Sequence, residues 1–354
     1  MSFLEPGRPA RAWLRGPAAL YGAAAQLRNW GYDRGWFTAA RLPVPVISVG
    51  NMTVGGTGKT PVVILLVEWL EAEGRRVAVL SRGYRRSRAD ERVLVSDGTR
   101  LLAGPPEAGD EPVLIARRCP RAVVAVGSDR AALGRWVLDR FSVDCVVLDD
   151  GFQHRALHRD LDIVLVDAMD AGGLEAMVPA GRLREPLKGV TRADALVITR
   201  ADDKQEVQTV RRRLASIHRS EAQPIEAVFR PHCTVSVLAD EVRALDTWRG
   251  KRAWLVSGIG NSASFNRSVT ALGLVVCGAG TFRDHYRYGK HDIERMKAEA
   301  KRAGADLVLT TEKDAGKLAP LLVAGDNWWA LRIATVVTQG EARLRDLVSR
   351  GVEG

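Results

Sequence analysis

Short apolar runs alternate with helical stretches through the middle of the chain, and this alternation constrains the fold more than any other feature. The apolar runs cover residues 46–49, 77–80, 122–126, 145–148, 163–166 and 195–199. Stretches with helical character, such as 62–73 and 130–141, lie among them. A strand that is apolar at every position is buried on both faces, as in parallel sheets covered by helices on each side. The sequence therefore predicts an α/β fold with a doubly wound, mainly parallel sheet.

The first predicted strand leads into a glycine-rich loop that ends in Gly58-Lys59-Thr60. Glycines let backbone amides curve around phosphates, a lysine neutralises phosphate charge, and a hydroxyl at this position can ligate magnesium. A helix beginning near Lys59 adds its positive dipole end. Residue 53 is threonine where the standard spacing has glycine, so the loop is a variant P-loop. The alternative is a tight glycine turn without a ligand. We predict an ATP site made by Thr53, Val54, Gly55, Gly56, Thr57, Gly58, Lys59 and Thr60.

A second acidic element follows the apolar run 145–148, which ends in Asp149 and Asp150. In P-loop enzymes such an element holds magnesium directly or through water. The carboxyl ends of parallel strands are also where α/β sheets place ligands. An apolar run that ends in two aspartates is by itself more often a strand cap. Downstream of a P-loop in the same sheet, it predicts a Mg²⁺ site that also involves Thr60.

The chain has 354 residues, enough for about two domains. Residues 205–230 are polar and charge-rich, which predicts a lobe boundary, and apolar runs resume at 253–256, 274–276 and 307–310. We expect three parts: an amphipathic N-terminal segment at 1–42, a P-loop core at 43–225, and a smaller α/β lobe at 226–354 that closes over the site.

The N-terminal segment combines apolar side chains at helical spacing with arginines. The apolar set is Trp13, Pro17, Leu20, Tyr21, Ala24, Leu27 and Trp30, followed by Trp36 and Phe37. The arginines are Arg8, Arg11, Arg15, Arg28 and Arg34. This pattern suits a helix that lies at an anionic membrane surface. A helix packed on the protein's own core is the alternative. The net charge of +10 favours an anionic partner.

Composition excludes several classes of protein. Four scattered cysteines without a CxxC pair argue against a disulfide framework or zinc knuckle and fit a reducing cytosol. No stretch reaches the roughly eighteen apolar residues that a spanning helix needs, and the N-terminus lacks the pattern of a signal peptide. We find no nucleic-acid-binding signature, so we expect no nucleic acid. No obligate protein partner is evident from the sequence, and we expect none.

Three weaker motifs have competing interpretations. Residues 258–263 imitate a dinucleotide fingerprint, but no acidic residue follows at the expected distance, so a strand–helix turn explains them. Arg82, Arg85 and Arg86 follow the run 77–80, where they would meet an anionic substrate or simply form a solvated basic loop. Residues 199–202 loosely resemble the guanine-reading motif of GTPases, with arginine in place of lysine.

Taken together, the motifs resemble those of the tetraacyldisaccharide 4′-kinase family, the lipid A 4′-kinases of Gram-negative bacteria. The matching segments are 49–61, 109–112, 148–154, 181–186, 257–261, 282–286 and 311–314, in order over almost the whole chain. The family's own loop carries the same non-glycine at position 53. This combination is far more specific than a P-loop alone.

The resemblance implies transfer of the ATP γ-phosphate to the 4′-hydroxyl of an acylated disaccharide 1-phosphate, which gives the 1,4′-bisphosphate lipid A precursor. It implies ATP and Mg²⁺ as cofactors. It also implies a peripheral protein on the cytoplasmic face of the bacterial inner membrane, bound to an anionic membrane surface. The basic, aromatic N-terminal segment is consistent with that location.

The resemblance also implies roles for individual residues. Asp110 is the expected general base, paired with His285 across the cleft between the lobes. Asp149, Asp150 and Glu185 are expected to ligate magnesium or to lie just behind its ligands, and Arg184 to contact phosphate. Candidate substrate contacts are Arg82, Tyr84, Arg130 and His154. From the residues alone, Asp110 would be a turn cap and His285 a packed histidine.

Two rival functions remain distinguishable by experiment. A regulatory P-loop ATPase would hydrolyse ATP without a lipid acceptor, and it usually carries a second lysine early in the loop, which is absent here. A kinase of a soluble metabolite would not need detergent-dispersed substrate.

Overall fold

The computed structural model describes residues 11–84, 86–87, 90–215, 217, 224–239 and 241–353. The described residues form one continuous sheet, in the order β11-β10-β12-β13-β8-β7-β6-β1-β5-β2-β4-β3, with β9 beside β8. The strands are β1 (Val46–Asn51), β2 (Val77–Ser81), β3 (Val93–Asp97), β4 (Val123–Val126), β5 (Cys145–Asp149), β6 (Leu161–Asp167), β7 (Ala195–Thr199), β8 (Ile225–Ser236), β9 (Val242–Arg243), β10 (Arg252–Ser257), β11 (Val275–Thr281), β12 (Leu307–Thr311) and β13 (Trp328–Gln339). The α-helices are α1 (Arg15–Asp33), α2 (Lys59–Ala72), α3 (Pro105–Ala108), α4 (Asp110–Arg118), α5 (Arg130–Leu138), α6 (Lys204–Ala215), α7 (Ser262–Ala271), α8 (Lys290–Arg302), α9 (Glu312–Leu318) and α10 (Glu341–Glu353). Short 3₁₀ helices are η1 (Ala12–Leu14), η2 (Ala168–Leu174), η3 (Leu187–Arg192), η4 (Leu245–Trp248) and η5 (Ala319–Leu321).

The larger lobe is built on the parallel strands β1, β2, β4, β5, β6 and β7, with β3 antiparallel at the edge. Alternate residues of β1 enter different cores: Ile47 and Val49 pack with α2, α4 and α10, whereas Val46 packs with α5 on the opposite face. Helices α2, α4 and α10 thus cover one face, and α5, α6 and η2 cover the other. The predicted doubly wound α/β fold is confirmed, since every run predicted in this lobe overlaps a strand.

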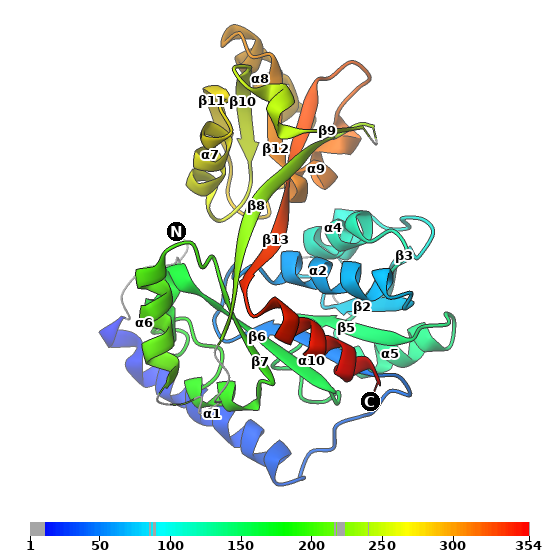
Figure 1. The fold of residues 1–354 in the computed structure, drawn as a ribbon, viewed down its shortest axis with the longest axis vertical. Helices are drawn as coiled ribbons and strands as arrows, with labels where there is room; N and C mark the ends of the chain where they lie inside the picture. The colour runs from blue at the N-terminus through cyan, green and yellow to red at the C-terminus, as the bar shows by residue number, and fades with distance from the viewer. Residues whose placement is uncertain are drawn as a thin grey trace.

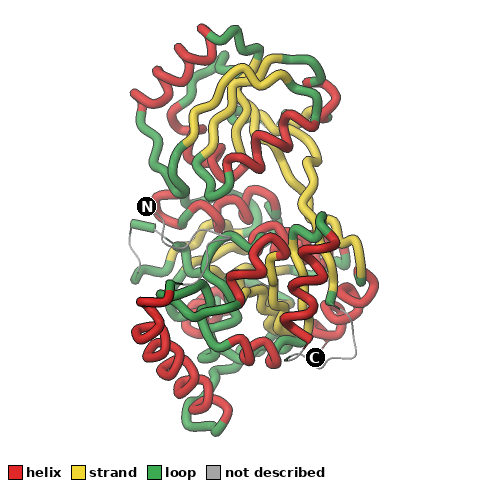
Figure 2. The backbone as a smooth tube through the Cα atoms, turned by 90° about the vertical axis from the view of Figure 1, so that its left-hand side faces the viewer, coloured by secondary structure: helices red, strands yellow, loops and turns green. Residues whose placement is uncertain are grey.

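The smaller lobe is joined to the larger one by two long antiparallel strands. Strand β8 leads out and β13 returns, and their pairing runs from Ser236 and Trp329 to Glu226 and Gln339 (Figures 1 and 2). Beyond this pair, β10, β11 and β12 form a parallel sheet packed against α7, α8 and α9.

The position of the C-terminal helix α10 differs from the expected domain division, which assigned all residues after 225 to the smaller lobe. Leu344, Val348 and Val352 of α10 are buried in the core of the larger lobe, where Gly351 lies against Leu161. The chain therefore enters the smaller lobe through β8 and leaves it through β13. We propose a larger lobe made of the P-loop core plus α10, with the smaller lobe as an insertion between them.

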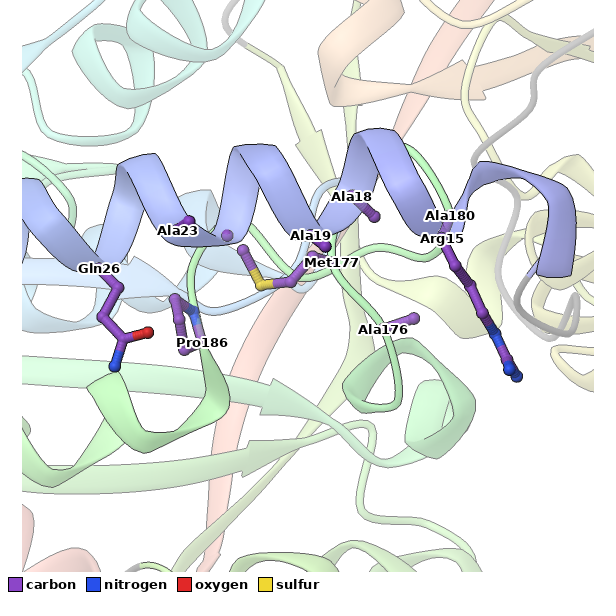
Figure 3. A pocket seen from close by; sticks show the side chains of 10 residues that line it. Arg15, Ala18, Ala19, Ala23, Gln26, Ala176, Met177, Ala180 and Pro186 are labelled. Carbon is purple, nitrogen blue, oxygen red and sulfur yellow. The ribbon is translucent and has the colours of Figure 1, made fainter.

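The N-terminal helix α1 packs through its small residues rather than its large ones. Ala18 and Gly22 are buried against the segment 176–186, and a Cβ on Gly22 would sit 3.6 Å from Cγ of Met177. A groove of about 380 Å³ runs along the helix beside this contact (Figure 3). Its lining residues are Arg15, Ala18, Ala19, Gly22, Ala23, Gln26, Ala176, Met177, Ala180 and Pro186.

The large apolar side chains of the N-terminal segment point to solvent. The exposed set is Trp13, Leu20, Tyr21, Leu27, Trp30, Trp36 and Phe37, with Leu20 76% exposed. Helix α1 is therefore packed on the protein, as the alternative expected, but through its small residues, whereas its large apolar side chains remain exposed. Arg8 lies outside the described residues. Among the helices that the structure describes, none is long and apolar enough to cross a membrane.

Candidate active site

The phosphate loop joins β1 to α2 and adopts backbone angles that require glycine at two positions. Gly55 has φ +114° and Gly58 has φ +82°, both in the region that L side chains rarely occupy. A Cβ on Gly58 would also lie 2.1 Å from Cζ of Phe229, a residue of β8. The loop is therefore packed directly against the strand pair that connects the lobes.

Side chains outside the loop hold its carbonyl groups. Asn51 Nδ2 donates to the Thr53 carbonyl at 2.6 Å, and Arg182 Nη2 donates to the Val54 carbonyl at 2.7 Å. The Val54 amide in turn donates to the Arg182 carbonyl at 2.8 Å. These contacts fix the first half of the loop.

Thr199, which ends β7, and Arg200, which follows it, hold the carbonyl groups in the second half of the phosphate loop. Thr199 Oγ1 donates to the Thr57 carbonyl at 2.8 Å, and Arg200 Nη2 donates to the Gly56 carbonyl at 3.0 Å. In a planar trans peptide the C=O and the next N–H point in opposite directions. Carbonyls held from outside therefore turn the N–H groups of Thr57 and Gly58 toward the opposite side, as a phosphate-binding loop requires.

The acidic strand end lies beside Lys59. Asp150 accepts Arg184 Nη1 at 2.8 Å and lies 3.6 Å from Lys59 Nζ. Burial acts to raise the pKa of Asp150, but Lys59 and Arg184 outweigh it, so the pKa is lowered. Asp149 is buried and accepts from Ser81 Oγ at 2.8 Å. Burial, and then the charge of Asp150, raise the pKa of Asp149 to about 6.

Glu185 is fully buried, and its oxygens accept hydrogen bonds from three side chains. Asn29 Nδ2 of α1 donates at 2.7 Å, Gln153 Nε2 at 3.0 Å and Arg192 Nη2 at 2.8 Å. Gln153 Nε2 also donates to the Asn51 carbonyl at 2.9 Å. Glu185 therefore links α1 to the strand that enters the phosphate loop.

The donor set of this site suits a magnesium ion bound together with phosphate. Thr60 lies in the first turn of α2, Asp149 ends β5, and Asp150 follows it beside Lys59. Within the described part of the chain, no three His, Cys, Asp or Glu side chains are grouped closely enough to hold a metal on their own. Mg²⁺ usually takes one or two carboxylates and completes its shell with water and substrate phosphates. The residues present fit that mode of binding.

The predicted pair of Asp110 and His285 is assembled from both lobes. Asp110 begins α4, and His285 lies in the turn after β11, where its Nδ1 is 3.1 Å from Asp110 Oδ2. Lys313 Nζ lies 3.3 Å from Nε2 of the same ring. Because an ammonium group can only donate, the tautomer with its proton on Nδ1 satisfies both contacts.

The surroundings of Asp110 favour its ionised form. Burial acts to raise the pKa of Asp110, but the hydrogen bond from His285 and the charges of Lys317 and Lys313 outweigh it, so the pKa is lowered. Glu111, which follows Asp110, acts through its charge on the pKa of both Lys59 and Asp149. The start of α4 therefore lies near the phosphate loop.

Backbone strain is concentrated at these residues. The described non-glycine residues with positive φ are Asp150, Arg200 and His285, at φ 58°, 53° and 60°. Residues in sparsely populated backbone regions persist where the surrounding structure fixes them, and they cluster at functional sites. One is in the acidic strand end, one supports the phosphate loop, and one contacts Asp110.

Two of the predicted substrate contacts, Arg82 and Arg130, lie near each other, and Arg130 also lies near Asp150; we call these two arginines the basic surface. Arg130 is buried, and burial and then the charge of Arg82 lower its pKa. Burial and then Arg130 lower the pKa of His154 to about 4, so this ring is uncharged at neutral pH. The Tyr84 ring lies 5.7 Å from the ring of His285. Arg85 lies outside the described residues.

The weaker motifs serve structural roles. The Gly258 amide donates to Asp314 Oδ2 at 2.8 Å, and a Cβ there would lie 2.8 Å from the Tyr288 hydroxyl, so the 258–263 turn is closed by its own lobe. In the 199–202 motif, Arg200 is paired with Asp167 and contacts the phosphate loop.

A family model described as Tetraacyldisaccharide-1-P 4′-kinase matches residues 10–352. The chain belongs to this family. A relative named tetraacyldisaccharide 4′-kinase from Anaeromyxobacter sp. (strain Fw109-5) is 42% identical over 325 residues, covering 92% of this chain and 87% of that protein. The relative of the same name from Geobacter sulfurreducens is 41% identical over 318 residues, covering 89% and 87%. The crystal structure of LpxK from Aquifex aeolicus in complex with ATP is 34% identical, with a TM-score of 0.78 over 97% of this chain and 99% of that one.

Several residues of this kinase site escaped sequence reasoning. Ser81, Arg182, Thr199 and Lys317 contact predicted site residues or the phosphate loop but carried no assigned role. Arg182 has a local signal, because it lies within the 181–186 segment that resembles the family. Thr199 directly ends a predicted strand, and that position at the carboxyl edge of the sheet was a usable signal.

Proposed function

We propose that this member of the family transfers the γ-phosphate of ATP to the 4′-hydroxyl of tetraacyldisaccharide 1-phosphate, with Asp110 as the general base. The observation that carries the proposal is the meeting of two halves of a site. A phosphate loop with its lysine and acidic strand end faces the start of α4, and there a buried carboxylate is held ionised by His285.

The loop amides would bind the triphosphate. Lys59 and Arg184, which both contact Asp150 in this structure, would pair with the phosphate oxygens. Burial lowers the pKa of Lys59 despite Asp150, so an added phosphate charge compensates a buried ammonium. These cations oppose the negative charge that spreads over the transferred group.

Mg²⁺ would be held by the Thr60 hydroxyl and by Asp149 or Asp150, and when bound it supplies neutralising charge to the phosphates. The raised pKa of Asp149 fits this assignment, because a buried carboxylate beside another carboxylate favours a nearby cation. The contacts of Glu185 to Asn29, Gln153 and Arg192 support a role behind the ligands rather than as a ligand.

At the other end, Asp110 takes the proton of the 4′-hydroxyl group while the hydroxyl oxygen forms a bond to the γ-phosphorus. The bond between the γ-phosphorus and the β,γ-bridging oxygen breaks, and ADP leaves with that oxygen. A sugar hydroxyl is a poor nucleophile, and a positioned base contributes about 10²–10⁴-fold. His285 holds the carboxylate through Nδ1–H. The basic surface of Arg82 and Arg130, with Tyr84 and His154, would receive the phosphorylated sugar.

We further propose that α1 holds the enzyme at an anionic membrane surface on the cytoplasmic side of the inner membrane. The exposed Leu20, Leu27 and Trp30 of α1, with arginines of the same segment, suit the interface between water and lipid. Asn29 of α1 contacts Glu185, so the helix that meets the lipid surface also contacts the catalytic lobe. Such a link would present the site to a lipid-borne acceptor.

The test is incubation of the protein with γ-labelled ATP and tetraacyldisaccharide 1-phosphate in mixed micelles. We expect label on the lipid, abolished by Lys59→Ala. Release of labelled inorganic phosphate alone, with no labelled lipid, would favour a P-loop ATPase instead. Transfer to the deacylated disaccharide as fast as to the lipid would favour a soluble acceptor.

A further inference from the structure

A second cation of the smaller lobe reaches the proposed base. Lys317, near the end of α9, places Nζ 3.3 Å from Oδ2 of Asp110, the same oxygen that His285 contacts. The Lys317 side chain is only 8% exposed, so its ammonium is not a solvated surface charge. Oδ1 of Asp110 has no hydrogen-bond partner among the residues that the structure describes.

Within the smaller lobe, Lys317 forms an ion pair with Asp314. Its Nζ lies 2.7 Å from Oδ1 of Asp314, whose side chain is fully buried. Asp314 Oδ2 accepts from the Gly258 amide and from Thr311 Oγ1, each at 2.8 Å. The ammonium also lies 5.4 Å from the centre of the Tyr288 ring. These contacts fix the direction in which Lys317 reaches the larger lobe.

We propose that Lys317 is a positioning residue for phosphoryl transfer, which holds Oδ2 of Asp110 together with His285 so that Oδ1 is presented to the acceptor hydroxyl. A carboxylate with one oxygen held from two directions loses its freedom to rotate, and its other oxygen remains to take the proton. The inference rests on the proposed role of Asp110 as the base.

The arrangement also ties the base to the contact between the lobes. Asp110 belongs to the larger lobe, whereas His285, Lys313 and Lys317 come from the smaller one, so the base is held only while the lobes are together. The charged or titratable groups around Asp110 are His285, Lys313, Lys317, Glu111, Asp284, Asp314 and Tyr288. Of the cations, Lys313 is occupied by Glu111 and Asp284, at 2.8 and 3.1 Å.

A purely structural ion pair between Lys317 and Asp314 is the competing explanation. It predicts that loss of Lys317 changes stability alone. A positioning role predicts a change in the pH dependence of catalysis, because removal of the ammonium raises the pKa of Asp110 and the base is then protonated at higher pH.

The test compares Lys317→Met with Lys297→Met. Lys297 is also in the smaller lobe, where it pairs with Asp326, and it has no contact with the proposed site. Because the pKa of Asp110 is lowered, kcat and kcat/KM for the lipid are measured for both variants from pH 3 to 9, at saturating ATP and Mg²⁺. For Lys317→Met we expect the acid limb to move up by about one unit or more, with kcat at the plateau about tenfold lower and ATP affinity unchanged. The control should match the wild type.

Two further variants separate the possible failures. Should Lys317→Met fail to fold because Asp314 is left as a buried charge, the pair Asp314→Asn with Lys317→Met removes both charges, and the same acid-limb shift is expected. Asp110→Asn is measured in parallel. If Asp110→Asn abolishes turnover while the Lys317 variants keep the wild-type pH profile and kcat, the positioning role is wrong and the base assignment stands. If Asp110→Asn retains turnover, the base assignment fails and the inference falls with it.

Discussion

The hydrogen bond from Thr199 to the phosphate loop leads to a specific prediction about ATP affinity. Thr199 is fully buried at the end of β7, and its Oγ1 donates to the Thr57 carbonyl at 2.8 Å. Thr199→Val removes this donor and keeps the volume and branching of the side chain. The Thr57 carbonyl then loses the contact that turns the Gly58 amide in the opposite direction.

The expected magnitude follows from the loss of one neutral hydrogen bond. Such a bond contributes about 0.5–1.5 kcal/mol, so the dissociation constant of ATP should rise by roughly 2–12-fold. At saturating ATP, kcat and the KM for the lipid should stay close to wild type, because Thr199 has no contact with Asp110 or the basic surface.

The assay is calorimetric titration with a non-hydrolysable ATP analogue, together with the KM for ATP. Thr199→Ser keeps the hydroxyl and serves as the matched control, with near wild-type affinity. An unchanged ATP affinity in a folded Thr199→Val variant would refute the claim that this hydroxyl orients the loop. An equal rise in the KM for the lipid would indicate general disruption instead.

Two further predictions concern the acidic strand end and the N-terminal helix. Because its pKa is raised to about 6, Asp149 favours the folded state when protonated, and this stability is lost as pH rises through that value. Asp149→Asn should therefore stabilise the ligand-free protein by about 3 kcal/mol at pH 8 in chemical unfolding, with no gain below about pH 4; no gain at pH 8 would contradict the raised pKa. Replacing Trp13, Leu20 and Leu27 of the exposed face by serine should reduce co-sedimentation with anionic liposomes by at least about tenfold while leaving the melting temperature unchanged. The exposed Val323 replaced by serine is the control, and equal binding by all proteins would refute the membrane role.

The larger lobe could be predicted from sequence because its strands are buried on both faces. Strands β1, β5, β6 and β7 are buried at every position and therefore appear as mainly apolar runs. Strand β8 is different: its burial is irregular, with Arg230 exposed, because it crosses between the lobes with little cover. The polar stretch that predicted a boundary thus includes the first half of a connecting strand.

Contacts between residues far apart in the sequence could not be predicted from local sequence patterns. Leu344, Val348 and Val352 show that α10 is amphipathic, but nothing in their spacing reveals that the helix packs against β1 and β6 rather than in the smaller lobe. The role of Lys317 could not be predicted either, because its partner Asp110 is far away in sequence.

The residues of the candidate site fall into the same two groups, those that local patterns predict and those that depend on long-range contacts. The phosphate loop and Asp149 and Asp150 were found from local pattern, because a loop that binds phosphate needs contiguous glycines and a lysine. Asp110 and His285 were found only through resemblance to the family, because their function depends on a contact between lobes. The structure brings this pair within 3.1 Å, but their role in turnover stays a prediction.

The central claim is that Asp110 and His285 act as one unit in proton transfer, and a double-mutant cycle on kcat tests it most directly. Asp110→Ala and His285→Ala should each lower kcat by about 10²–10⁴-fold with ATP binding largely intact, since neither residue belongs to the phosphate loop. The double variant should be little slower than the slower single variant, because residues that act as a unit give non-additive losses. Losses that multiply in the double variant, or a His285→Ala enzyme with normal kcat, would contradict the account.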